Sequence, residues 1–273
     1  MWGVAGILWR SLRRLWGRDT MLFVGGVSFF AMLATFPGLM LLVGVYGLVL
    51  SPEVAATQAE SVAALMPEVA RELVGSELRR LAHAPAGAVS VQSGLALLVA
   101  LYAAHRGFKA LIAGLSFVHD GETPHGLIRF NLLALAILGA AFLALPALTA
   151  AFLALQVLAA AFGIRLISNV GQWLGAGAGV VLALALIYRY AMSSRPVLWR
   201  ASLIGAASAA LLTLVASWGA AVYVNAITGL GAAYGSVTAV VILLIWLSWS
   251  VQAVFFGGAL ATEIERSLEG LSA

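Results

Sequence analysis

Five stretches of this chain contain no Asp, Glu, Lys or Arg, and each is longer than a membrane crossing requires. They cover residues 20–52, 81–105, 130–164, 166–188 and 201–262. A helix needs roughly 20 apolar residues to cross the hydrocarbon core of a bilayer. The last stretch is long enough for two crossings and is expected to divide at the glycine-rich segment VNAITGLGAAYG. The stretches therefore predict six spans.

The composition agrees with a membrane protein. The chain is 63% hydrophobic and 10% charged, with a mean hydropathy of +1.04, whereas soluble domains carry roughly a quarter charged residues. The apolar stretches lack the alternation of a membrane β-barrel, so helices are left to satisfy the backbone inside lipid. The sequence predicts an all-α polytopic membrane protein that forms a single membrane domain over residues 1–273.

The distribution of Lys and Arg predicts the orientation, because these residues are enriched in cytoplasmic loops. With six spans and both ends in the cytoplasm, eleven fall inside: Arg10, Arg13, Arg14, Arg18, Arg106, Lys109, Arg129, Arg189, Arg195, Arg200 and Arg266. Four fall outside: Arg71, Arg79, Arg80 and Arg165. Splitting 130–164 into two spans at Pro146 would leave eight Lys and Arg residues inside and seven outside. Six spans therefore fit the orientation rule better.

Residues 1–18 form an amphipathic pattern. A helix there groups its apolar residues on one face: Ala5, Leu8, Trp9, Leu12, Leu15 and Trp16. Arg10, Arg13, Arg14 and Arg18 fall largely on the other face. This pattern is typical of a helix in the membrane interface, either as an orienting anchor or in contact with anionic headgroups.

Two connections are expected to carry helices of their own. Segment 53–83 is predicted to be an external pair of short helices, because SPE and MPE resemble helix starts. The second span is expected to end near Ala104, followed by an interfacial helix within a cytoplasmic connection over 105–125. His105, His119 and His125 lie there at spacings that do not fit a metal site, so no metal is predicted.

Prolines interrupt two of the long stretches. Pro37 and Pro146 each remove a backbone donor and are expected to bend their helices. The bends serve either to fit over-long helices around their neighbours or to expose carbonyls along a substrate path. The candidate path residues are Thr35, Pro37, Pro146, Gln156, Ser248 and Gln252.

Two further groups of residues are candidates for contacts. Arg14, Arg18, Arg106, Lys109 and Arg129 are placed to attract anionic lipid headgroups. Gly171, Gly175 and Gly179 form overlapping small-xxx-small patterns that allow another helix to approach closely, within this chain or in a second copy.

No ionisable side chain lies deep in a predicted span, which disfavours proton relays and ion-coupled carriers. Glu263 and Glu265 are expected to form a solvated helix end. No nucleophile, base and orienting group occur in recognisable order, so we predict no enzyme, no catalytic residue and no cofactor. The net charge of +4 needs no nucleic-acid partner, because the orientation rule accounts for most of it.

Several segments together resemble the YihY/BrkB-like family of bacterial inner-membrane proteins, some formerly labelled ribonuclease BN. They are FFAMLATFPGLMLL, HRGFKALIAGL, RFNLLAL, IYRYAMSSRPVLWRASLIGA and AAYGSVTAVVILLIWLSWSVQAVFFGGALATEIER. The resemblance covers about 19–266. It departs at Gly257–Ala261, where the family often has Gly-Ala-Glu-Leu-Asn and this chain lacks the carboxylate and the amide.

The resemblance implies a six-span inner-membrane fold and a general association with envelope lipid homeostasis. The ribonuclease label fits poorly, because neither metal-binding carboxylates nor an acid/base pair is visible. We hypothesise that the protein translocates or handles lipid or another amphiphile, with membrane lipids as its partners. The alternatives are a structural or assembly partner of envelope protein complexes, or a homo-oligomer in that role, and a channel for small polar solutes.

Overall fold

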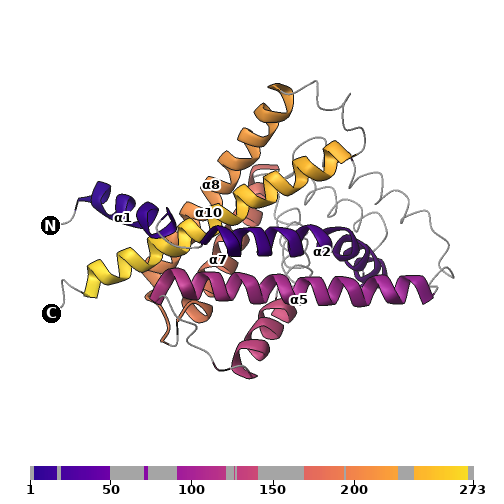
Figure 1. The fold of residues 1–273 in the computed structure, drawn as a ribbon, viewed down its shortest axis with the longest axis horizontal. Helices are drawn as coiled ribbons and strands as arrows, with labels where there is room; N and C mark the ends of the chain where they lie inside the picture. Colours follow the sequence, from indigo (N-terminus) through magenta and orange to yellow (C-terminus); the bar gives the residue numbers. More distant parts are fainter. Residues whose placement is uncertain are drawn as a thin grey trace, which may run out of the picture. The chain divides into compact units, whose positions relative to one another are not determined.

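Every element that the structure describes is a helix (Figure 1). The computed structural model describes residues 3–16, 20–49, 71–72, 91–120, 126, 128–140, 169–193, 195–226 and 237–269. At 4, 36–49, 91–97, 120, 169–176, 224–226 and 237 it describes the backbone alone. The predicted all-α class is confirmed, since these described ranges contain no strand.

The helices follow the predicted apolar stretches. They are α1 (Val4–Trp16), α2 (Thr20–Val49), α5 (Val91–Asp120), a helix over Ile128–Ala140, α7 (Asn169–Ala191), α8 (Trp199–Ala226) and α10 (Val237–Glu269). The longest apolar stretch is divided between α8 and α10, as its glycine-rich segment predicts. Among the described residues, three helices are long and apolar enough to cross a membrane: Leu98–His119, Trp199–Tyr223 and Thr238–Glu269.

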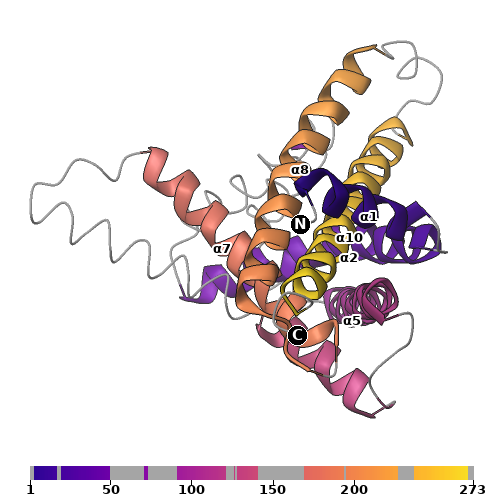
Figure 2. The same cartoon turned by 90° about the vertical axis from the view of Figure 1, so that its left-hand side faces the viewer.

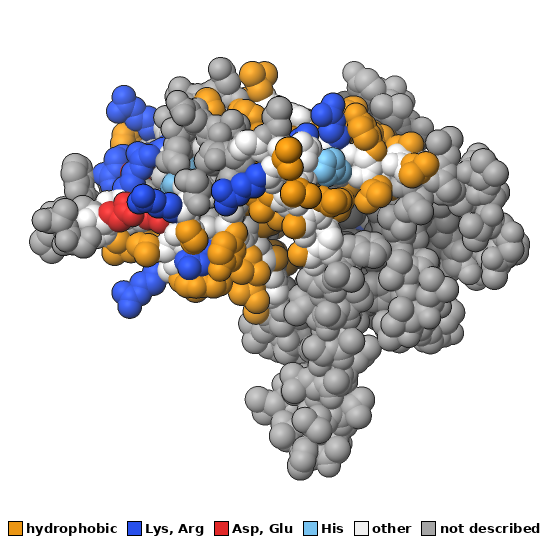
Figure 3. Space-filling view, turned by 90° about the horizontal axis from the view of Figure 1, so that it is seen from below, with side chains coloured by type: hydrophobic (Ala, Val, Ile, Leu, Met, Phe, Trp, Pro, Cys, Tyr) orange, Lys and Arg blue, Asp and Glu red, His pale blue; other side chains and the backbone are white. Residues whose placement is uncertain are grey.

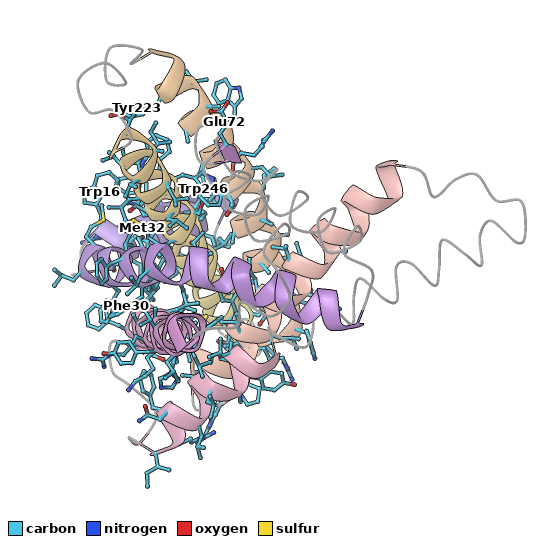
Figure 4. All side chains as sticks on the ribbon, turned by 90° about the vertical axis from the view of Figure 1, so that its right-hand side faces the viewer. Trp16, Phe30, Met32, Glu72, Tyr223 and Trp246 are labelled. Carbon is cyan, nitrogen blue, oxygen red and sulfur yellow. The ribbon has the colours of Figure 1, made fainter. Side chains whose placement is uncertain are left out.

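Helix α5 differs from the expected pair of shorter elements. It continues without a break through residue 104 to Asp120. No proline interrupts this range, and Gly107 does not end the helix. Instead, a Cβ added at Gly107 would lie 3.3 Å from the Cβ of Phe30, so this glycine is where α2 and α5 approach each other. Figure 4 labels Phe30 at this position on α2.

The chain divides into two compact units. Unit 1 comprises Met1–Thr20, Ile112–Ala210 and Val254–Ala273, and unit 2 comprises Met21–Leu111 and Leu211–Ala253. Helices α5, α8 and α10 contribute to both.

Unit 1 is built around a close crossing of α8 and α10. A Cβ at Gly257 would lie 2.5 Å from the carbonyl oxygen of Gly205 and 2.7 Å from both the Cβ of Ala209 and the hydroxyl of Tyr188. Tyr188 is fully buried and donates to the carbonyl of Val254 over 2.6 Å. Only glycine lets the two backbones come this close, because any side chain would overlap the facing helix.

Unit 2 is held by aromatic side chains of α8 and α10. The indole of Trp246 donates to the hydroxyl of Ser217 over 2.9 Å. The rings of Tyr223 and Trp249 meet edge to face, with centroids 6.2 Å apart. Figure 4 labels Trp246 on α10 and Tyr223 towards the end of α8. Buried indole and phenol groups usually find such polar partners.

Large apolar side chains cover the outside of the helices. On α8 the exposed ones are Trp199, Leu203, Ile204, Leu211, Leu214, Val215, Trp218, Val222 and Tyr223. A water-soluble helix would carry charged residues on such a face. A surface of this kind is the one expected where lipid is the solvent.

Candidate functional site

The most polar region of unit 1 lies around Glu263, near the C-terminal end of α10. Arg10 donates from Nε to Glu263 Oε2 over 2.7 Å. Arg14 donates to Oε1 from Nη2 over 2.6 Å and from Nε over 3.0 Å. Glu263 is only 7% exposed. The expected solvated helix end is therefore wrong, because two arginines from α1, about 250 residues away, cover the carboxylate.

Arg14 also reaches the end of α5. Its Nη1 donates to the carbonyls of Val118 and His119 over 2.9 and 3.1 Å. Arg266 donates to the carbonyl of His119 as well, over 3.1 Å. The last carbonyls of a helix have no partner within it and carry partial negative charge, so two guanidinium groups stabilise this end of α5.

His119 is buried between α5 and α10. Its Nδ1 lies 2.9 Å from the hydroxyl of Thr262, which itself donates to the carbonyl of Gly258 over 3.0 Å. The hydroxyl of Thr262 thus lies within hydrogen-bond distance of both groups, and the tautomer of His119 sets which of Nδ1 and the hydroxyl donates. The other ring nitrogen, Nε2, lies 3.9 Å from Glu265 Oε2.

Glu265 connects this region to α8. Its Oε1 accepts from the backbone N–H of Leu198 over 2.9 Å, directly before α8 begins. A carboxylate at a helix N-terminus is favoured by the partial positive charge there.

We refer to Arg10, Arg14, His119, Thr262, Glu263, Glu265 and Arg266 as the polar cluster. It joins four chain segments within unit 1: α1, the end of α5, the start of α8 and the end of α10. Helix α1 runs beside the end of α10 in both ribbon views (Figures 1 and 2). Figure 3 shows basic side chains gathered around the acidic ones. The arrangement is suited to holding helix ends together, because its charges are paired with one another.

The polar cluster also fixes which face of α1 points outward. Arg10 and Arg14 turn towards Glu263, while Trp9 is 66% and Trp16 84% exposed. Leu8 and Leu12 are exposed on the same helix. In water a helix would be expected to bury these residues and expose its arginines. The observed orientation suits an interfacial helix with its apolar face in lipid.

Of the predicted path residues that the structure describes, two are engaged within their own helices and one reaches another helix. Thr35 donates to the carbonyl of Ala31 and Ser248 to that of Leu244. Gln252 approaches the sulfur of Met21 at 3.6 Å. Pro37 lies in the continuous helix α2, but its side chain is outside the described residues, as are Pro146 and Gln156.

The predicted headgroup residues fall into different environments. Arg14 belongs to the polar cluster and its side chain is 10% exposed, so its charge is directed into the protein. Arg129 is exposed, and so is Arg106, which lies over the ring of Tyr102. Lys109 is half-buried, and Arg18 lies outside the described residues.

The close helix approach expected at Gly171, Gly175 and Gly179 stays a prediction. Gly179 is half-buried in α7, and Gly171 and Gly175 are described by backbone alone. A close approach that was not predicted lies at Gly205 and Gly257. Ala201, Gly205 and Ala209 follow the same small-xxx-small spacing, so the sequence did contain a signal for this crossing. The partner of Glu263 left no comparable signal, because it depends on the tertiary fold.

Groups of His, Asp and Glu able to hold a metal ion do not occur in the ranges that the structure describes. The polar cluster has only His119, Glu263 and Glu265 as potential ligands, and both carboxylates are engaged by N–H donors.

Outward apolar faces on long helices, together with the exposed apolar residues of α1, define an integral membrane protein. Residues 11–272 match the family model described as virulence factor BrkB. The chain belongs to this family, YihY/BrkB, as its sequence motifs indicate. Comparison with curated proteins and with solved structures gives no match.

Proposed function

We propose that the protein is a multi-pass protein of the cell inner membrane, with six spans and both ends in the cytoplasm. The polar cluster supports this topology. In the proposed topology the four segments that it joins lie on one side of the membrane, with an even number of crossings between each and the next, and their direct contacts agree with this arrangement. The orientation rule makes that side cytoplasmic, with eleven of the fifteen Lys and Arg residues on it.

Within this topology we propose that the protein translocates or handles lipid or a similar amphiphile. One observation carries this choice over a channel for polar solutes. Ser28, Thr35, Ser208 and Ser248 each donate to a carbonyl four residues earlier, over 2.7 to 2.8 Å. A water-filled pore needs polar groups turned to its lumen, whereas an amphiphile can move along an apolar surface that faces lipid.

Exposed basic residues would supply the headgroup contacts. Arg106 and Arg129 are exposed, unlike Arg14. Each exposed arginine near an anionic membrane surface contributes about 1 kcal/mol of attraction. In this proposal the protein has no catalytic step and no cofactor, and its partners are membrane lipids. Docking of other envelope proteins, or of a second copy, stays a prediction from the sequence.

Purified protein in liposomes is expected to exchange labelled phospholipid between leaflets faster than empty vesicles do. The double variant Arg106→Gln, Arg129→Gln should exchange phosphatidylglycerol more slowly, by roughly fivefold for each arginine removed. Its exchange of phosphatidylcholine should slow less. Loss of a fluorescent lipid signal to an impermeant quencher measures the rate. Glu269→Gln, an exposed change at the end of α10, serves as the control and should leave the rate unchanged. Exchange at the empty-vesicle rate, with folded protein present, would contradict the proposal.

A further inference from the structure

The connection between α7 and α8 is fixed by Arg189, a residue that the polar cluster does not include. The carbonyl oxygen of Arg189 accepts from the N–H of Val197 over 3.0 Å, and its Nη1 donates to the carbonyl of Val197. Val197 is buried, so the connection is folded back onto the end of α7.

Two exposed aromatic rings hold the guanidinium of Arg189. Its Cζ lies 4.8 Å from the ring centroid of Trp199 and 5.3 Å from that of Tyr190. Trp199 is 41% and Tyr190 50% exposed. Cation–π contacts of this kind place a positive charge beside two rings of the type that collects at membrane interfaces.

The charge of the connection is left uncompensated in the part of the chain that the structure describes. Arg189 has a buried Nε without a hydrogen-bond partner and forms no ion pair there. Arg195 and Arg200 are exposed and form none there either. The carboxylate of Glu265 lies close to Leu198, but its two oxygens face the N–H of Leu198 and the ring of His119. Three positive charges thus lie at or beside the connection, and the described residues give none of them an ion-pair partner.

Apolar side chains continue from these arginines along α7 and α8. Leu186, Leu198, Leu203 and Ile204 are all exposed. A ligand that fits this surface has an anionic head and an apolar tail. The planar guanidinium group matches the oxygens of a phosphate with two parallel hydrogen bonds.

We propose that the α7–α8 connection binds the phosphate of an anionic phospholipid. Arg195 and Arg200 contact the headgroup, Arg189 supplies a fixed charge between Tyr190 and Trp199, and the acyl chains lie on the exposed leucines. The proposal rests on the proposed function in one respect, since it needs this connection to lie at a membrane surface.

Native mass spectrometry of the detergent-purified full chain tests the site. The protein is titrated with phosphatidylglycerol and with phosphatidylcholine of the same acyl chains. We expect the wild type to prefer phosphatidylglycerol at least fivefold, and the double variant Arg195→Gln, Arg200→Gln to weaken its binding about twenty-five-fold, or roughly fivefold per arginine. Arg13→Gln removes an exposed arginine from α1 and should keep at least half of the preference.

Three results would overturn the inference: no preference in the wild type, unchanged binding in the double variant, or an equal loss in Arg13→Gln. Displacement of the lipid by millimolar inorganic phosphate would also contradict it, because a free anion would then suffice. Lipid exchange in vesicles is measured on the same preparations. If the wild type binds phosphatidylglycerol but does not exchange lipid, the proposed function is contradicted and the site is not. If the wild type exchanges lipid but the double variant binds phosphatidylglycerol as well as the wild type does, the site is contradicted and the proposed function is not.

Discussion

Replacing Glu263 by alanine is expected to lower the free energy of unfolding by about 3 to 5 kcal/mol, the usual cost of breaking a buried ion pair on one side. Glu263 is the shared acceptor of Arg10 and Arg14. Its loss leaves the charge of Arg14, whose side chain is 10% exposed, without a carboxylate. The effect should appear as a large fall in the midpoint of thermal unfolding in detergent.

The same substitution is expected to release α1. Trypsin cleaves after arginine, and α1 carries Arg10, Arg13 and Arg14. Cleavage there should become faster in Glu263→Ala than in the wild type, whereas Gly177→Ala, where an added Cβ meets nothing within 4 Å, should not speed it. Combining Glu263→Ala with Arg14→Ala should cost less than the sum of the single changes, because the two residues interact directly. Additive effects would show that the ion pair does not hold α1.

Gly257→Leu is expected to prevent unit 1 from folding, and Gly257→Ala to destabilise it by about 1 to 3 kcal/mol, the usual cost of overpacking a tight interior. The first side-chain atom at position 257 would already lie 2.5 Å from the carbonyl oxygen of Gly205 and 2.7 Å from the hydroxyl of Tyr188. These are backbone and firmly packed atoms, so α8 and α10 would have to separate.

Gly177 offers the matched control. It also lies in an apolar helix, α7, but a Cβ added there meets nothing within 4 Å. Gly177→Ala should therefore leave the unfolding midpoint unchanged or raise it slightly, because alanine favours helix more than glycine does. Thermal unfolding followed by intrinsic fluorescence or by size-exclusion chromatography measures both variants. Equal stability of Gly257→Ala and the wild type would contradict the close crossing.

The helices were predictable because membrane spans are encoded locally. The charge-free stretches located α2, α5, α7, α8 and α10, and the glycine-rich segment located the division of the longest one. The amphipathic pattern of residues 1–18 gave a helix but not its orientation. Which face turns inward depends on Glu263, whose distance along the chain leaves no periodic signal.

The candidate site was less predictable for the same reason. Glu263 and Glu265 follow an apolar span, as exposed residues at a helix end often do, and only the tertiary fold brings α1 and the start of α8 over them. The hydroxyls of Thr35 and Ser248 show the opposite case. A hydroxyl inside an apolar helix looks available in the sequence, but in the structure the carbonyl four residues earlier accepts its hydrogen.

Labelling of single cysteines in oriented membrane vesicles tests the central claim most directly. The chain has no cysteine of its own, so each introduced one reports a single position. Arg13→Cys, Arg195→Cys and Glu269→Cys lie at exposed positions of the segments that the polar cluster joins.

An impermeant maleimide is predicted to label these three positions from the cytoplasmic side. Tyr223→Cys, 24 residues along α8 from its start and so about 36 Å away, should be labelled from the opposite side. Labelling of Arg13→Cys and Glu269→Cys from opposite sides, or of Tyr223→Cys and Arg195→Cys from the same side, would contradict the account.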